Sequence, residues 1–485
     1  MYLNNLILNI ILVILLLVPT ALISGPFLPD FFISLSSLLF LFLIIKEKKI
    51  KFLINKFSII FFLIYIYLVT LSFFSYDRYL SLESSLFYFR FGLFALCIVY
   101  LLENIKKINK YFFWCLFIPL FLVSFDSVYQ LIFKINIIGY QVDPGKYQIT
   151  GLFGDEKILG SYVLRLSPIF LAFFFIRFKD SIYSNLFLFF SIFLFLFVTF
   201  ISGERTSFFM MLFSIILYTI FINGYRIYKA LILLFLIPIL SFIIFTSYKI
   251  LSDKDYLQTH VLNNSLIPEV IKKSITRNIY QTISSMKQSP FKKIARDKDG
   301  DDIPEVKKIG NADEFKKNKT HIFSLQHELH YESAYKMFNS SKLFGHGPKL
   351  YRILCNNKEF EPAHIDIQRR ELSQNNHDLV SVLHQCSTHP HHTYLQLLAE
   401  TGIIGTIPII FLFLFSVYIL ASGFIKRILP NYIPAENFNI SIIISLVINF
   451  WPIMPSPNFF NNYISVIYFL SIGLFLKKYI KYNNE

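Results

Sequence analysis

Two adjacent histidines, His391 and His392, are the residues of this sequence best suited to chemistry. They follow Pro390 and precede an apolar stretch that contains Gly402 and Gly405, two small residues that permit close packing as a helix enters a membrane. We therefore expect both histidines at the membrane surface, where a side chain with an ordinary pKa of about 6.5 can take a proton from a substrate hydroxyl. The alternative is a histidine that only caps the helix. Candidate substrate-binding residues in the same run are Tyr394 and Gln396.

Basic side chains near the apolar stretches form a second group of candidates. Arg205 lies in the very short turn Ser202–Ser207 between two apolar stretches. An arginine at that depth is costly unless it meets an anion, and its planar guanidinium suits phosphate oxygens. Glu204 beside it is the alternative partner. Further candidates to bind an anionic substrate or to shape its entrance are Gly151 and Lys157 in a glycine-punctuated loop, Arg165 inside an apolar stretch, and Arg277.

Composition decides which kind of fold carries these residues. The chain has 485 residues, of which 55% are hydrophobic and only 16% are charged. Soluble domains carry about 25% charged residues, and disordered chains are less apolar, so both classes are excluded. Apolar runs of nearly 20 residues can cross about 30 Å of hydrocarbon as a helix. We therefore predict an all-α polytopic membrane protein, in which a net charge of +15 need not mean nucleic-acid binding.

Twelve apolar stretches, broken by charges or turn residues, are predicted to span the membrane. The first is taken as an uncleaved helix, because Met1 to Asn5 lacks the Lys or Arg of a signal peptide and more spans follow. The predicted spans are residues 6–24, 31–45, 57–74, 84–102, 111–133, 159–176, 184–202, 207–223, 230–247, 403–425, 437–454 and 459–476.

The distribution of Lys and Arg orients these spans. With the N-terminus in the cytoplasm, the six inside segments hold 17 of the 46 Lys and Arg residues, and the short outside loops hold few. This asymmetry follows the positive-inside rule, so both termini are expected in the cytoplasm. The expected parts are residues 1–247 with nine spans, a large and mostly helical outer loop at 248–390, and residues 391–485 with the histidine run and three spans.

All eleven histidines lie in the large outer loop or at its edge, and the loop also contains two of the four cysteines. In an oxidising compartment Cys355 and Cys386 are expected to form a disulfide that stabilises by about 3–4 kcal/mol, with two free thiols as the alternative. Residues 289–320 are rich in charged side chains and are predicted to be a solvated insertion. Residues 330–357 instead show apolar residues at helical spacing, with a break at Gly345.

The sequence predicts neither a metal nor a cofactor. Asp297–Asp302 resembles the start of a calcium loop, but the glycine at its sixth place and the glutamate at its twelfth are missing. His327 and His330 are three positions apart, whereas the zinc pattern H-E-x-x-H places its histidines four apart. No glycine-rich nucleotide motif is present either.

Taken together, these features resemble the O-antigen ligase and O-antigen polymerase superfamily of bacterial inner membranes. Three features match in order: the glycine-rich outer loop, the short turn with Arg205, and a large outer loop that ends in a histidine motif. In the ligases that motif is His, then Asn, Ser or Gln, nine residues, Gly, two residues and Gly. His391, Gly402 and Gly405 fit it, and His392 stands where an amide or hydroxyl side chain is usual. Which histidine is the base therefore stays open.

The resemblance implies a metal-independent, inverting glycosyltransferase of the C type whose site faces the periplasm. Its donor would be a glycan on undecaprenyl pyrophosphate, and its acceptor the lipid A core or another lipid-linked glycan. His391 would deprotonate the acceptor hydroxyl. Arg205, helped by Lys157 or Arg277, would stabilise the departing pyrophosphate.

Several functions remain open at this point. A ligase transfers a finished polysaccharide to the lipid A core, whereas a polymerase joins repeat units on the same carrier, and both use the same residues. The histidine motif with both glycines favours the ligase, and transfer to a protein hydroxyl would use the same chemistry. A transporter, from a different class, would line a path with charged residues inside its spans. Those candidates are few: Arg90, Asp126 and Arg165.

Overall fold

The protein is all-helical in the part that the structure, a computed structural model, describes: residues 2–142, 148–252, 269–276, 278, 325–362, 386–427 and 435–480. One antiparallel bridge, between Ile135 and Gln141, accompanies the helices there. The α-helices are α1 (Tyr2–Ala21), α2 (Phe27–Lys46), α3 (Lys56–Phe73), α4 (Arg78–Ser85), α5 (Phe89–Asn104), α6 (Ile108–Phe133), α7 (Leu159–Arg177), α8 (Ile182–Ile201), α9 (Arg205–Phe221), α10 (Arg226–Ser252), α11 (Glu269–Ile275), α14 (Leu325–Ser340), α15 (Tyr351–Leu354), α17 (Thr393–Lys426), α18 (Asn437–Asn449) and α19 (Asn462–Leu476). The predicted all-α fold class is confirmed.

Within the described residues, eight helical segments are long and apolar enough to cross a membrane. They are α1 with the short turn after it, α2, α3, α4 joined to α5, α6, α7, α8 and α17. Helices α9, α18 and α19 are apolar but have only 17, 13 and 15 residues. Every predicted span coincides with a helix, and the chain is a membrane protein. The number of crossings, about twelve, stays a prediction.

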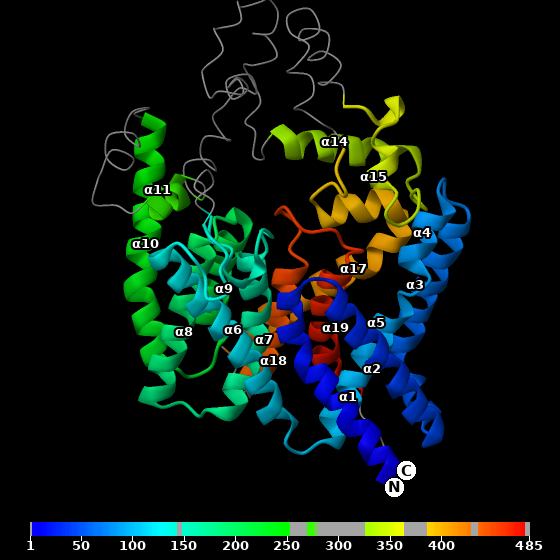
Figure 1. The fold of residues 1–485 in the computed structure, drawn as a ribbon, viewed down its shortest axis with the longest axis horizontal. Coiled ribbons are helices and arrows are strands. Elements are labelled where there is room, and N and C mark those ends of the chain that lie inside the picture. The colour runs from blue at the N-terminus through cyan, green and yellow to red at the C-terminus, as the bar shows by residue number, and fades with distance from the viewer. Residues whose placement is uncertain are drawn as a thin grey trace, which may run out of the picture.

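The helix bundle has a central layer made of α7, α18 and α19 (Figure 1). α18 packs against α7, and α19 packs against α5. Aromatic rings fill the interior, as where Phe112 of α6 stacks on Phe173 of α7 with ring centroids 4.8 Å apart. α14, α15 and the first part of α17 form a separate layer, called the outer layer below, at the end of the bundle opposite the start of α1 (Figure 1). This layer carries the histidine run.

Two arginines inside the bundle have protein partners, as burial in a membrane requires. Arg90 of α5 forms an ion pair with Asp30 of α2 at 2.6 Å. Arg165 of α7 donates to the side-chain oxygen of Asn449 at 2.6 Å. These contacts join helices that are distant in sequence, so they give both arginines a structural role and weaken the transporter hypothesis.

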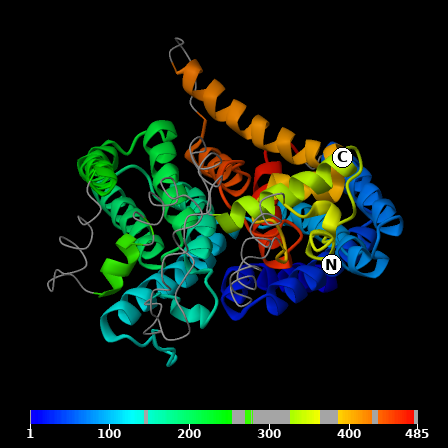
Figure 2. The ribbon, with the colours of Figure 1, turned by 90° about the horizontal axis from the view of Figure 1, so that it is seen from above.

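Helix α17 is divided by a kink at Gly402, whose backbone has φ 61° and ψ −168°. The first part, residues 393–401, belongs to the outer layer. The second part, residues 403–426, runs along the edge of the bundle as a long helix (orange in Figure 2) and exposes much of its apolar surface, as a lipid-facing helix does. Just beyond its end, Arg427 donates to the backbone carbonyl of Ile220 at 2.9 Å. The long helix therefore connects the outer layer to the far end of α9.

Candidate active site: a histidine cluster in the outer layer

One face of α14 brings two histidines of the outer loop to the start of α17. His327, His330, Ala334 and Met337 recur at spacings of three and four residues and so share one face of the helix. Ala334 and Met337 are fully buried in a small apolar cluster that includes Ala399 of α17. This packing against Ala399 places the histidines at the start of α14 beside the N-terminal end of α17.

His391 lies at the centre of a cluster of four imidazole rings. Its ring centroid is 5.4 Å from that of His327, 5.6 Å from that of His330 and 4.1 Å from that of His389. The sequence pointed to His391 through the histidine motif, and His389 lies two residues before it. His327 and His330 were considered only as a zinc pattern with the wrong spacing. The signal that would have found them is their helical spacing with Ala334.

The backbone of His391 is held in an uncommon conformation. Its φ is 56°, in the left-handed region, where a non-glycine residue is strained unless its surroundings fix it. Those surroundings are the loop between α18 and α19, where the amide of Ser456 donates to the carbonyl of His391 at 2.9 Å. The hydroxyl of Ser456 also accepts from the amide of Thr393 at 2.6 Å. The strained backbone is therefore fixed on both sides of the α17 N-terminus.

The two adjacent histidines have different surroundings. His392 is the N-cap residue of α17, and its Nδ1 accepts a hydrogen bond from the amide of Leu395 at 3.3 Å. Within the described residues no hydrogen bond involves the ring of His391, which is only partly buried. The helix-capping alternative thus describes His392, whereas the ring of His391 is open to a ligand.

Burial and the neighbouring basic groups lower the pKa of three of the clustered histidines. Burial, followed by the nearby His330, lowers the pKa of His391 to about 4. Burial, followed by the charges of His391, His330 and Arg205, lowers the pKa of His327 to about 4. Burial and His391 lower the pKa of His389 to about 3. Near neutral pH these rings are uncharged, and an uncharged imidazole can accept a proton.

Arg205 starts α9 without being neutralised by the glutamate next to it. The carboxylate of Glu204 instead accepts hydrogen bonds from the amides of Gly160 at 2.6 Å and Ser161 at 2.9 Å, and from the hydroxyl of Ser207 at 3.0 Å. Glu204 therefore caps the N-terminus of α7, where a negative charge is favoured. In the part of the chain that the structure describes, Arg205 forms neither an ion pair nor a hydrogen bond.

Two of the other candidates hold the protein together. Gln396 is fully buried, donates to Glu400 at 3.0 Å and to Asn458 at 2.8 Å, and accepts from the amide of Phe459 at 2.9 Å. Tyr394 donates to the carbonyl of Phe450 at 2.7 Å. Both residues fasten α17 to its neighbours, and both N–H groups of the buried Gln396 side chain already have partners inside the protein.

The remaining candidates lie apart from the cluster or outside the described residues. Gly151 has φ 57°, and its amide donates to the side chain of Gln130 at 2.8 Å, which fixes a turn against α6. Lys157 is exposed in the turn before α7. Arg165 is buried against Asn449, as described above. Arg277 and the acidic segment Asp297–Asp302 lie outside the described residues.

The predicted disulfide connects α15 to the histidine run. The structure pairs Cys355 with Cys386, and their Cα atoms are 5.3 Å apart. Cys355 is fully buried in the apolar cluster of the outer layer, and Cys386 packs against that cluster. The pairing therefore anchors the chain five residues before His391.

Backbone contacts between two glycines lock the outer layer to the kink in α17. A Cβ atom on Gly345 would lie 2.5 Å from the amide nitrogens of Thr401 and Gly402, and one on Gly402 would overlap the backbone of Leu343. Only glycine allows the two segments to approach this closely. Four backbone hydrogen bonds join them: His346 to Ala399 (3.1 Å), Gly347 to Glu400 (2.7 Å), Ile403 to Lys342 (2.9 Å) and Ile404 to Leu343 (3.3 Å).

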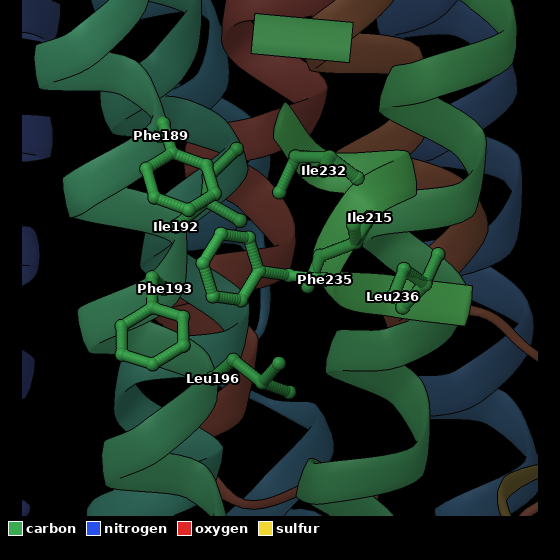
Figure 3. A pocket seen from close by; sticks show the side chains of 8 residues that line it. All are labelled: Phe189, Ile192, Phe193, Leu196, Ile215, Ile232, Phe235 and Leu236. Carbon is green, nitrogen blue, oxygen red and sulfur yellow. The ribbon is translucent and has the colours of Figure 1, made fainter. Parts of the chain in front are cut away.

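A cavity lies between α8, α9 and α10 but carries no chemistry (Figure 3). Its volume is about 10 Å³, close to the minimum that one water molecule needs. Its lining is entirely apolar: Phe189, Ile192, Phe193, Leu196, Ile215, Ile232, Phe235 and Leu236. The polar groups of the histidine cluster are therefore the better candidate site. Among the described residues, no three His, Cys, Asp or Glu side chains are arranged to hold a metal ion.

Comparison with known proteins finds one family that resembles part of the chain. No curated protein matches the chain. Residues 190–410 match the family model described as O-antigen ligase. This region contains Arg205, α14, the histidine run and the kink at Gly402. Residues 190–410 of this membrane protein are therefore similar to the O-antigen ligase family.

Proposed function

We propose that this protein is an inverting glycosyltransferase that moves a glycan from undecaprenyl pyrophosphate to an acceptor hydroxyl on the periplasmic face of the bacterial inner membrane. The first acceptor to consider is the lipid A core, as in a ligase. The observation that carries the proposal is the environment of His391, an uncharged ring without a hydrogen-bond partner among the described residues, at the start of an apolar helix. Arg205 acts on His327, whose ring lies beside that of His391. Both histidine and arginine lie in the region that matches the O-antigen ligase family.

His391 is the proposed base. Its ring nitrogen takes the proton of the acceptor hydroxyl, while the acceptor oxygen forms a bond to the anomeric carbon of the donor. The bond from that carbon to the phosphate oxygen breaks, and its electron pair leaves with the pyrophosphate. Because attack and departure occur on opposite faces of the carbon, the configuration inverts. His392 is less suited to this step, since its Nδ1 already accepts a hydrogen bond from Leu395.

The bound donor would adjust the strength of this base. A pKa of about 4 makes the empty site a weak base. The pyrophosphate of the donor brings negative charge next to the cluster, and an opposite charge nearby raises the pKa of an imidazole. The base would thus become stronger when the donor is in place, which limits proton abstraction to the complex.

This coupling predicts different pH profiles for kcat/KM and kcat. His391 must be uncharged to act, so activity should fall as the pH drops through its pKa. The acid limb of kcat/KM, which reports the free enzyme, should lie near pH 4, and that of kcat, which reports the donor complex, should lie at higher pH. The titratable groups around His391 are His327, His330, His389, Tyr331 and the adjacent His392. Arg205 acts on His327, and Arg352 acts on His389.

Steady-state kinetics between pH 4 and 8, with a thermal melt at each pH, would measure both limbs. The melts are needed because buried neutral histidines also make folding sensitive to acid: the unfolded chain binds protons near pH 6.5 that the folded chain refuses until about pH 4, so stability falls across that range. Coincident limbs in kcat and kcat/KM, measured where the protein is folded, would contradict the proposed coupling.

Arg205 is the proposed cation for the departing pyrophosphate. Replacing it with alanine should lower kcat by about 10²–10³-fold, the usual cost of one lost group that stabilises developing charge. Arg205→Lys should recover only part of the rate, because an ammonium lacks the planar fork that binds two phosphate oxygens. Arg427 contacts the C-terminal end of α9, whereas Arg205 begins that helix. Arg427→Lys is therefore a control and should leave the rate unchanged. Equal activity of Arg205→Ala and the wild type would remove Arg205 from the mechanism.

The reaction itself is tested with purified protein, a lipid-linked glycan donor and an acceptor. We expect transfer with inversion and release of undecaprenyl pyrophosphate. A polymerase would carry out the same step with a second lipid-linked glycan as acceptor, and the family covers both reactions. Deleting the gene separates them, because a missing ligase leaves lipid A core without repeat units and a missing polymerase leaves core with a single unit. Absence of transfer to both acceptors would contradict the proposed function.

A further inference from the structure

The loop between α18 and α19 supports the first residues of α17. It reaches the outer layer (Figure 1), and hydrogen bonds fasten it to α17 on both sides of Ser456. Before Ser456, the carbonyl of Phe450 accepts from the hydroxyl of Tyr394 at 2.7 Å. After it, the amide of Phe459 donates to the side chain of Gln396 at 2.9 Å. The loop is therefore a fixed neighbour of the α17 N-terminus.

The segment Pro455-Ser456-Pro457 of this loop carries a single backbone N–H group, that of Ser456, because proline has none. This N–H group donates to the carbonyl of His391 at 2.9 Å. A second donor to the same carbonyl, the hydroxyl of Tyr331, is 3.5 Å away, at the limit for a hydrogen bond. The amide of Ser456 is therefore the closer of the two contacts.

The hydroxyl of Ser456 holds the next peptide group along the chain. It accepts from the amide of Thr393 at 2.6 Å and lies 2.7 Å from the hydroxyl of Thr393. Thr393 is the first residue of α17, so its amide has no partner inside the helix. Ser456 thus binds both peptide groups that follow the Cα atom of His391, the first at its carbonyl and the second at its N–H group.

The direction of the His391 ring depends on these contacts. The φ of 56° is a conformation that a residue with a side chain rarely adopts without support. If the support is lost, the backbone relaxes toward a common conformation, and the Cα–Cβ bond turns with it. Within the described residues the ring makes no hydrogen bond of its own that would compensate for such a turn.

We propose that Ser456 is a positioning residue for glycan transfer, which holds the backbone of His391 so that the ring nitrogen faces the acceptor hydroxyl. This inference rests on the proposed function, in which His391 is the base. Ser456 itself transfers no proton. A misplacement of about 1 Å can lower the rate about 10²-fold, because the base must lie within hydrogen-bond distance of the proton it takes. Donor binding does not require this distance, so the effect is on kcat and not on KM.

The first test compares Ser456→Ala and Ser456→Thr with the wild type. Alanine keeps the amide but releases the peptide group of Thr393, so we expect kcat to fall by about 10–100-fold with little change in KM. Threonine keeps the hydroxyl, so Ser456→Thr should recover most of the rate. If Ser456→Ala does not fold, Ser456→Cys takes its place, because a thiol is only a weak hydrogen-bonding group. A folded Ser456→Ala or Ser456→Cys variant with the kcat of the wild type would overturn the inference.

A double-mutant cycle distinguishes positioning from a general disturbance of the fold. In His391→Ala the ring is absent, so adding Ser456→Ala should cause no further loss of the residual rate. It should also leave unchanged the rate that added imidazole restores to His391→Gly, because free imidazole is not attached to this backbone. An equal loss from Ser456→Ala with and without the His391 ring would overturn the inference.

Ser465→Ala is the matched control. The hydroxyl of Ser465 in α19 donates to the carbonyl of Phe459 at 3.3 Å, so this variant also removes a serine hydroxyl that holds the loop. It leaves both peptide groups that follow His391 untouched, and kcat should stay unchanged. A fall in kcat as large as that of Ser456→Ala would show that any loosening of the loop is sufficient, and the specific role of Ser456 would be wrong.

Hydrogen exchange separates this inference from the proposed function, because it requires no turnover. The amide of Thr393 should exchange faster in Ser456→Ala and at the wild-type rate in Ser465→Ala. If the wild type transfers glycan, His391→Ala does not and Ser456→Ala does so at the full rate, the proposed function stands and the role of Ser456 is wrong. If the wild type transfers no glycan while exchange at Thr393 depends on Ser456, the support of the backbone stands and the proposed reaction is wrong.

Discussion

Replacing His391 with alanine should lower the rate of glycan transfer by about 10²–10⁴-fold, the usual contribution of a general base. The ring of His391 is partly exposed and makes no hydrogen bond among the described residues, so its removal takes away the proton acceptor without breaking a hydrogen bond there. The measurement is transfer by purified protein from a lipid-linked donor, with the product separated by chromatography.

Two variants distinguish chemistry from backbone strain at this residue. His391→Gly should be equally inactive but at least as stable as the wild type, because glycine adopts φ 56° without steric cost. Added imidazole should recover part of its activity by entering the space of the lost ring. His392→Ala should instead cost about 1 kcal/mol of stability through the lost N-cap and retain most of the activity. If His391→Ala is fully active, or if only His392→Ala is inactive, His391 is not the base.

The sequence was sufficient to predict the helical spans, because each span depends only on a local run of apolar residues. The histidine run and the cysteine pair were also visible in the sequence. The cluster itself was not, because it depends on α14 packing against α17, more than 60 residues further along the chain. His327 and His330 become part of the site only when Ala334 and Met337 are buried against Ala399.

Two other residues show what a local pattern leaves undecided. Glu204 follows the pattern of a partner for Arg205, yet its carboxylate caps α7, because the free amides of Gly160 and Ser161 at that helix start lie within reach. Gln396 follows the pattern of a residue that faces a substrate, yet it is fully buried and joined to Glu400 and Asn458. In both cases the deciding partner is a neighbour in space that the sequence does not identify.

The glycine kink in α17 is expected to give the largest effect on folding. Gly402→Ala should destabilise the outer layer by about 2–5 kcal/mol, since it adds the cost of a left-handed residue with a side chain, about 1–2 kcal/mol, to that of overpacking, about 1–3 kcal/mol. The added Cβ would overlap the backbone of Leu343 and lie 2.6 Å from the amide nitrogen of Phe344. These atoms belong to a backbone held by hydrogen bonds to α17, so they cannot move aside as a flexible side chain does.

Gly25→Ala is the matched control, because Gly25 has φ 108° and no atom within 4 Å of an added Cβ. It should show only the conformational cost, about 1–2 kcal/mol. Thermal melts of both variants, with limited proteolysis of the outer layer, would measure the difference. Equal stability of the two variants would mean that the contact with Leu343 contributes nothing.

Gly402→Ala should also abolish transfer while the helix bundle stays folded, because the kink sets the distance between α14 and α17. The carbonyls of Lys342 and Leu343 accept from Ile403 and Ile404 just beyond the kink, and α14 ends only two residues before Lys342. A shift at Leu343 is therefore transmitted along α14 to His327 and His330, whose rings lie about one helix length away beside His391. Gly345→Ala, which meets the same backbone from the opposite side, should give the same loss. Gly402 and Gly345 therefore influence the chemistry from a distance, because they fix where the rings around His391 lie.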